Sequence, residues 1–213
     1  MGTIKKGILG GFSGKVGTVV GASWKGIAYM RSLPQKVRNP RTEPQMMQRT
    51  KFAVTLNFLK PLNGLLRTGW KLYAHRQSPI NAAMSFTIAN AITGTYPNYA
   101  IDPSKVYISR GGLMPALNAS AVPSAGGSII FDWDDNSGSS TAKQTDKALL
   151  AVVNPEKSEA VFDIGGVTRS ETTSSVNLPA DWVGATVEAY MGFISEDGRE
   201  IANSVYVGSI VVT

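Results

Sequence analysis

The sequence predicts an α+β protein: an N-terminal glycine-rich β-hairpin and a short helical region, followed by an antiparallel β-sandwich. Three observations lead to this prediction. Seven glycines are interleaved with β-branched and aromatic residues over positions 7–33. Helical periodicity with capping signals follows, and short extended runs separated by turn formers occupy the rest of the chain. We therefore divide the chain into a basic arm (1–37), a helical region (38–100) and a sandwich (101–213).

The arm is predicted to be a two-stranded hairpin, because β-branched and aromatic residues favour strands and glycine permits tight turns. The expected strands are Lys15 to Trp24 and Ile27 to Leu33, with the turn at Lys25 and Gly26. A two-stranded ribbon is marginally stable in water. We therefore expect the arm to pack on the helices, on the sandwich or on another subunit.

The segment from Gly7 to Lys15 superficially resembles a phosphate-binding loop. That motif requires a hydroxyl residue after the lysine, whereas this chain has Val16. We therefore predict no nucleotide at this position and no cofactor anywhere in the chain.

The helical region is predicted to begin at a capping box. Thr42 and Gln45 have the spacing in which each side chain satisfies a backbone N–H of the other residue. Glu43 places a negative charge at the positive end of the helix dipole, and Pro44 lacks an N–H that the first turn would leave unpaired. A helix is expected over residues 43–60. Its buried stripe is predicted to contain Phe52, Leu56 and Leu59.

Two more helical segments are expected, over residues 62–75 and 79–92, the second with Ser78 as N-cap and Pro79 at the first position. His75 is the only histidine, and we expect it on the surface at a helix end. It has no second histidine or cysteine with which to bind a transition metal. No G-x-S-x-G motif supplies a nucleophile for it to activate.

From residue 105 onward the pattern is that of about seven short strands. Their number and spacing resemble an immunoglobulin or fibronectin type III sandwich. The acidic segment from Asp132 to Asn136 is interpreted as a hairpin turn, since no glutamate stands where a calcium loop requires one. The expected strands are 105–109, 128–133, 148–154, 159–164, 172–178, 185–195 and 204–212.

Charge is divided unequally along the chain. Residues 1–110 contain 16 Lys and Arg against two acids, a net charge of +14, and residues 111–213 contain five against 13, a net charge of −8. Such asymmetry indicates either that the basic half binds an anion such as nucleic acid or that opposite halves meet within or between copies. Two solvated surfaces of different sign are the third interpretation.

The composition sets the class of protein. The chain has 213 residues, 43% of them hydrophobic and 17% charged, which is typical of a folded protein. With no cysteine, it forms no disulfide or thiolate metal site. The N-terminal segment is too short and glycine-rich for the apolar core of a Sec signal peptide, and no run is long enough to span a membrane. We therefore expect a soluble protein without a membrane span.

One resemblance concerns the first 60 residues. The leader G-F-S-G-K-V-G at residues 11–17, the W-K-G at 24–26 and the N-P-R-T at 39–42, followed by Gln45, Gln48, Arg49 and Phe52, resemble a family of proteins of unknown function from Bacteroidota. The same pattern is similar to small structural proteins encoded in phage and prophage regions. The resemblance implies a structural or assembly role, in a virion or in the host cytoplasm during assembly. It supplies no catalytic residue.

The leading hypothesis is a non-enzymatic structural subunit of a phage particle or phage-derived assembly that self-associates through the basic arm and the acidic sandwich; other particle proteins are possible partners. The alternatives are a non-specific nucleic-acid-binding protein, in which cations meet phosphates and aromatic rings stack on bases, and a surface-displayed adhesion module. The residues expected to make the assembly or nucleic-acid contacts are Lys15, Trp24, Lys25, Tyr29, Arg31, Lys36, Arg38, Arg41 and Arg49.

Overall fold

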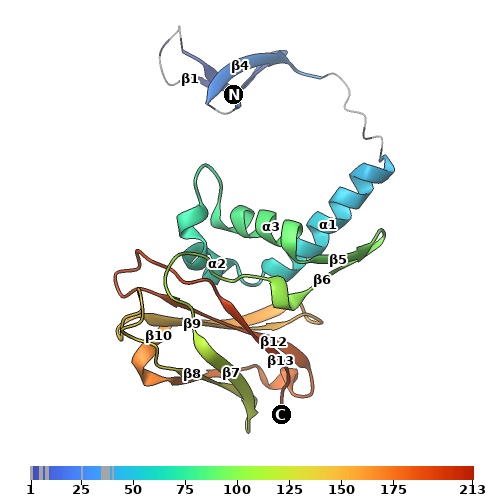
Figure 1. The fold of residues 1–213 in the computed structure, drawn as a ribbon. Helices are drawn as coiled ribbons and strands as arrows, with labels where there is room; N and C mark the ends of the chain where they lie inside the picture. The colour runs from blue at the N-terminus through green and yellow to red at the C-terminus, as the bar shows by residue number, and fades with distance from the viewer. Residues whose placement is uncertain (1, 5–6, 8–9, 25, 35–38, 40) are drawn as a thin grey trace. The chain divides into compact units, whose positions relative to one another are not determined.

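Figure 1 shows the fold of the chain in a computed structural model. The structure describes residues 2–4, 7, 10–24, 26–34, 39 and 41–213. The chain forms two compact units, residues 1–42 and 43–213, and each is described by itself. The boundary lies immediately before the first helix.

The first unit is an antiparallel sheet of four strands rather than the predicted two-stranded hairpin. The strands lie in chain order, β1 (Thr3–Ile4), β2 (Phe12–Val16), β3 (Val19–Trp24) and β4 (Ile27–Ser32). The predicted strand from Lys15 to Trp24 is wrong because Gly17 adopts a positive φ of 57° and turns the chain, so that Val16 pairs with Val19. The segment that superficially resembles a phosphate-binding loop, residues 7–15, overlaps β2.

Three α-helices begin the second unit. They are α1 (Glu43–Leu59), α2 (Asn63–Gly69) and α3 (Pro79–Asn90), and two short 3₁₀ turns follow α2 and precede the sandwich, η1 (Lys71–Tyr73) and η2 (Pro103–Lys105). Ser78 caps α3 as expected, since its hydroxyl oxygen accepts from the N–H of Asn81 at 3.3 Å. Phe52 was expected in the buried stripe of the first helix but is 49% exposed.

The rest of the second unit is a sandwich of two antiparallel sheets (Figure 1). One sheet has the order β10-β9-β12-β13 and the other the order β11-β8-β7. Their bounds are β7 (Leu117–Ser124), β8 (Ser128–Asp134), β9 (Lys147–Asn154), β10 (Glu159–Thr168), β11 (Thr173–Asn177), β12 (Thr186–Ile194) and β13 (Val205–Val211). Two more 3₁₀ turns, η3 (Arg169–Glu171) and η4 (Ala180–Trp182), flank β11, and a small hairpin, β5 (Ile92–Thr95) with β6 (Asn98–Ile101), follows α3.

The helices and the sandwich share one compact unit, so the predicted boundary at residue 100 does not separate two bodies. Strand β9 shows why, because it is buried on both faces. Leu149, Ala151 and Val153 belong to the core beneath the helices, whereas Leu150 and Val152 belong to the core between the two sheets. Side chains alternate along a strand, and so one apolar strand joins both cores.

The segment 105–109 was expected to be a strand and is not one. Val106 and Ile108 are fully buried, but side chains satisfy part of the local backbone hydrogen bonding. The Ile108 N–H donates to the Ser204 hydroxyl at 2.9 Å, and the Ser109 hydroxyl donates to the Ala202 carbonyl at 2.9 Å. The alternating apolar residues that predicted a strand here are therefore buried in the core without forming a strand.

Candidate functional site

The arm sheet presents two different faces, and its register decides which residues share each face. Lys15 on β2 lies opposite Val20 on β3, and Val20 lies opposite Arg31 on β4. Residues paired across antiparallel strands project from the same side of a sheet. Lys15 and Arg31 therefore lie on one face in a single cross-strand row, with half-buried Val20 between them.

Aromatic and apolar side chains extend this basic face. Trp24 pairs with Ile27, and Tyr29 pairs with Ala22. Because side chains alternate along a strand, these side chains project from the same face as Arg31. Trp24 is 64% exposed and Ile27 is 67% exposed. We call the set Lys15, Val20, Trp24, Ile27, Tyr29 and Arg31 the basic face of the arm. The structure thus brings four of the expected contact residues together.

The opposite face of the arm is apolar. Phe12 packs over Gly21, where an added Cβ would lie 2.6 Å from the ring, and Met30 lies opposite Gly21 on β4. Together with Ile4, Val16 and Val19, these side chains line a hollow of about 340 Å³. Met30 is 71% exposed. The first unit therefore leaves apolar surface on both faces of its sheet exposed.

The remaining expected contact residues do not all join this face. Arg41 is exposed and adopts a positive φ of 48°. Arg49 lies on α1, in the second unit, and is exposed. Lys25, Lys36 and Arg38 lie outside the described residues.

A face of opposite charge lies on the sandwich. On β8, Asp132 and Asp134 are exposed and alternate with buried Phe131 and Trp133, so both carboxylates project from the outer side of the three-stranded sheet. Asp134 accepts a hydrogen bond of 2.6 Å from the Asn118 side chain. We call the outward side chains Val122, Ile130, Asp132 and Asp134 the acidic face of the sandwich.

Asp135 lies in the turn that follows β8. The hydroxyl and the backbone N–H of Ser137 hydrogen bond to this carboxylate and hold its pKa below the ordinary value. Asp135 therefore keeps its negative charge to lower pH than an isolated aspartate would.

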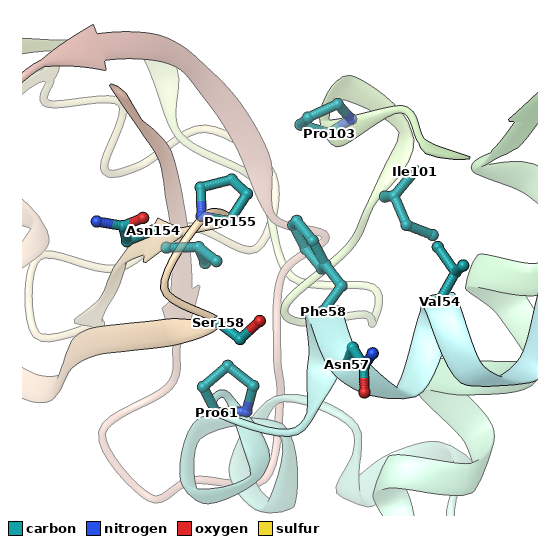
Figure 2. Close-up of a pocket in the computed structure, with 10 residues that line it drawn as sticks. Val54, Asn57, Phe58, Pro61, Ile101, Pro103, Asn154, Pro155 and Ser158 are labelled. Carbon is teal, nitrogen blue, oxygen red and sulfur yellow. The ribbon is translucent and has the colours of Figure 1, made fainter. Parts of the chain in front are cut away.

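The second unit also contains a hollow beside α1, which is lined largely by apolar side chains. The hollow in Figure 2, about 320 Å³, lies between the C-terminal part of α1 and the β9–β10 turn. Phe58, Val54 and Ile101 line it, and the amide of Asn154 points away from Phe58 (Figure 2). His75 is exposed, as expected. Within the described ranges, no group of three His, Asp or Glu is placed to hold a metal ion.

Among the helices that the structure describes, none is both long enough and apolar enough to cross a membrane.

The fold and the candidate site define the class. The second unit combines a helical layer with a sandwich of antiparallel sheets, and the candidate site consists of a charged strand face on each unit. The chain belongs to a family of unknown function, DUF6266, whose model matches residues 11–208. The resemblance to a family of unknown function is thereby confirmed, whereas an origin in Bacteroidota or phage stays a prediction.

No match was found among curated proteins. Among solved structures, the chain is similar to the fn3 domain of the human collagen alpha-1(XX) chain, with 12% sequence identity and a TM-score of 0.34, over 49% of this chain and 91% of that domain.

Proposed function

We propose that this protein is a non-enzymatic assembly subunit in which the basic face of the arm docks on the acidic face of the sandwich of a second copy. The observation that carries the proposal is the pairing register of the arm. It places Lys15 and Arg31 in one row, while β8 presents Asp132 and Asp134 on an exposed strand face. Complementary charge of this kind orients two partners and selects against wrong ones.

Charge at the level of whole segments supports this pairing. Residues 1–42 contain eight Lys and Arg and no acid, and residues 111–213 have a net charge of −8. Two arms repel each other, and so do two sandwiches. An arm of one copy is attracted to the sandwich of another.

Apolar side chains on both faces add to the attraction. Trp24 and Ile27 stand beside the cations of the arm, and Val122, 47% exposed, lies opposite Ile130 beside the aspartates of the sandwich. Burying apolar surface contributes roughly 25 cal/mol per Å². Docking would cover side chains that the first unit by itself leaves in water.

An arm that binds a different surface on the next copy is a heterologous contact, which produces a closed ring or an open filament. A particle built from repeated copies uses such contacts. A phage particle or phage-derived assembly is the setting that the resemblance of the leader implies.

The test is a charge reversal read by analytical ultracentrifugation of the full chain. Lys15→Glu with Arg31→Glu in one protein, and Asp132→Lys with Asp134→Lys in another, should each abolish self-association. Mixing the two proteins should restore association, because each then meets a complementary face on the other. Lys60→Glu with Arg67→Glu is the matched control, since both residues are exposed in the second unit and the charge change is the same.

Two results would contradict the proposal. A wild-type chain that stays monomeric at all concentrations has no such contact between copies. Reversed variants that associate as the wild type does would show that these four side chains do not form the interface.

Non-specific binding of single-stranded nucleic acid is the second candidate, and one observation favours it. Trp24 and Tyr29 are exposed on the face that also contains Lys15 and Arg31. Aromatic rings that stack on bases beside cations that neutralise phosphates form such sites. Affinity for a single-stranded oligonucleotide should fall steeply as salt rises from about 50 to 200 mM. An affinity that does not change with salt would eliminate this function.

A further inference from the structure

A second polar site lies in the helical layer, far along the chain from the arm. A hollow of about 310 Å³ lies against η1, α3 and the residue that follows α2, and its wall combines the rings of Trp70, Tyr73 and Phe86 with the guanidinium of Arg110. Gln77 and Asn90 add amide groups to the same wall. Its described lining includes no Asp or Glu.

Arg110 is held among the three rings. Its guanidinium carbon lies 4.6 Å from the ring centroid of Tyr73, 4.8 Å from that of Phe86 and 5.8 Å from that of Trp70. Cation–π attraction operates at these distances.

Contacts with neighbouring segments hold the Arg110 backbone and two of the three rings. The Arg110 backbone N–H donates to the Gly69 carbonyl at 3.0 Å. The Trp70 indole N–H donates to the Tyr107 carbonyl at 3.1 Å, and Phe86 stacks on Tyr107 at 5.0 Å between centroids. The backbone of Arg110 and two of the three rings are therefore held in place independently of any ligand.

The donors of Arg110 are unused, which distinguishes this arginine from Arg169 in the same unit. Arg169 is fully buried and directs its guanidinium N–H groups at Asp146, Asn136 and two backbone carbonyls. Arg110, which is half-buried, makes no side-chain hydrogen bond or ion pair with any other residue that the structure describes. Arg169 has a structural role, whereas Arg110 has donors available to a ligand.

We propose that this hollow binds a small organic carboxylate whose body is apolar or aromatic. A guanidinium presents parallel N–H groups that match the two oxygens of a carboxylate, and a charge-assisted pair of this kind is stronger than a neutral hydrogen bond. The three rings and the nearby Ala82 and Ala89 accommodate the apolar body. This site is separate from the arm and does not depend on the assembly role.

Benzoate is the probe, because it joins a carboxylate to a ring. In two-dimensional ¹H–¹⁵N NMR spectra of the full chain, benzoate should shift the Arg110 Nε–Hε signal with saturable, millimolar affinity. Acetate, which lacks the apolar body, should bind at least several-fold more weakly, and inorganic phosphate should rank below benzoate. Phosphate binding tighter than benzoate would overturn the assignment to a carboxylate with an apolar body.

Arg110→Gln should weaken benzoate binding at least tenfold, measured by calorimetry. Arg76→Gln is the control, since Arg76 is exposed and is not part of the lining, and it should bind benzoate as the wild type does. Arg110→Lys keeps the charge but loses the paired donors, so its affinity for benzoate should lie between that of the wild type and that of Arg110→Gln. If Arg110→Gln fails to fold, the wild-type titration decides, because an Arg110 signal that benzoate does not move overturns the proposal. Equal affinity of wild type and Arg110→Gln overturns it as well.

Discussion

Arg169 and Asp146 form an ion pair at the end of the sandwich core, with Arg169 Nη2 3.1 Å from Asp146 Oδ2 and both side chains fully buried. Asn136 Oδ1 accepts from Nη1 at 2.6 Å, the Met114 carbonyl accepts from Nη2 at 2.9 Å, and the guanidinium carbon lies 3.8 Å from the Phe193 ring centroid. Burial lowers the pKa of Arg169, and the attraction of Asp146 opposes that change. The pair joins segments that are far apart along the chain.

Arg169→Met should destabilise the second unit strongly. It leaves the Asp146 carboxylate buried without a cation, which costs about 3–5 kcal/mol. Thermal unfolding should show the loss, at about 2–4 °C per kcal/mol for a chain of this size. Arg199→Ala is the control, because Arg199 pairs with Asp197 at 3.6 Å but its side chain is 86% exposed, and such pairs contribute about 0–1 kcal/mol. Equal losses in the two variants would contradict a structural role of the buried pair.

Gly69→Ala should also destabilise the second unit. A Cβ at this position would lie 2.3 Å from the Ile108 carbonyl oxygen and 3.0 Å from the Ser109 Cα, so backbone must move. Overpacking of this kind costs about 1–3 kcal/mol. Gly112→Ala is the matched control, since its Cβ meets nothing within 4 Å. Denaturant midpoints measure both, and a Gly69 variant as stable as the Gly112 variant would show that the chain relaxes around the methyl group.

Ser78→Ala should remove the N-cap of α3. The Asn81 N–H then loses its acceptor, at a cost of about 1 kcal/mol. Ser85→Ala, on the exposed side of the same helix, should change stability by a few tenths of a kcal/mol, because alanine is the better helix former. Chemical denaturation followed by circular dichroism compares the stability of the two variants. Ser78→Ala should be the less stable of the two, and the opposite order would contradict the capping role of Ser78.

Ser195→Ala should raise the pKa of Asp197 toward its ordinary value. In the wild type the Ser195 hydroxyl, 2.6 Å from Asp197 Oδ1, is the main cause of the lowered pKa, and the Arg199 backbone N–H adds to it. A lowered carboxyl pKa stabilises the fold above the unfolded-state pKa and loses that effect as pH falls through the folded-state pKa. The variant should therefore begin to lose this contribution at higher pH.

Carbon-13 NMR of the aspartate carboxyl groups between about pH 2 and pH 6 measures this shift. Asp135 is the internal control, because its lowered pKa depends on Ser137, which the substitution leaves in place. An Asp197 pKa that does not move would assign the shift to the Arg199 backbone N–H instead.

Local chemistry determined much of the second unit from the sequence. A serine followed by a proline favours a helix start, with the serine as N-cap and the proline in the first turn, and α3 begins at Ser78 and Pro79 in this way. Strand β9 was evident because an apolar run bounded by turn formers has few other stable conformations in a core. Strand β7 was missed, since its small and polar residues form a strand only through pairing with β8. The charge asymmetry is a property of the sequence alone.

By itself the sequence determined where the cations lie along the chain, which segments are apolar and where the helices begin, because these depend on neighbouring residues. The tertiary structure decided which side chains meet. The turn at Gly17 places Lys15 and Arg31 on one face, and the fold brings Asp146 to Arg169 and places Arg110 beside three aromatic rings. Register and packing are set by contacts between distant segments, and no local pattern encodes them.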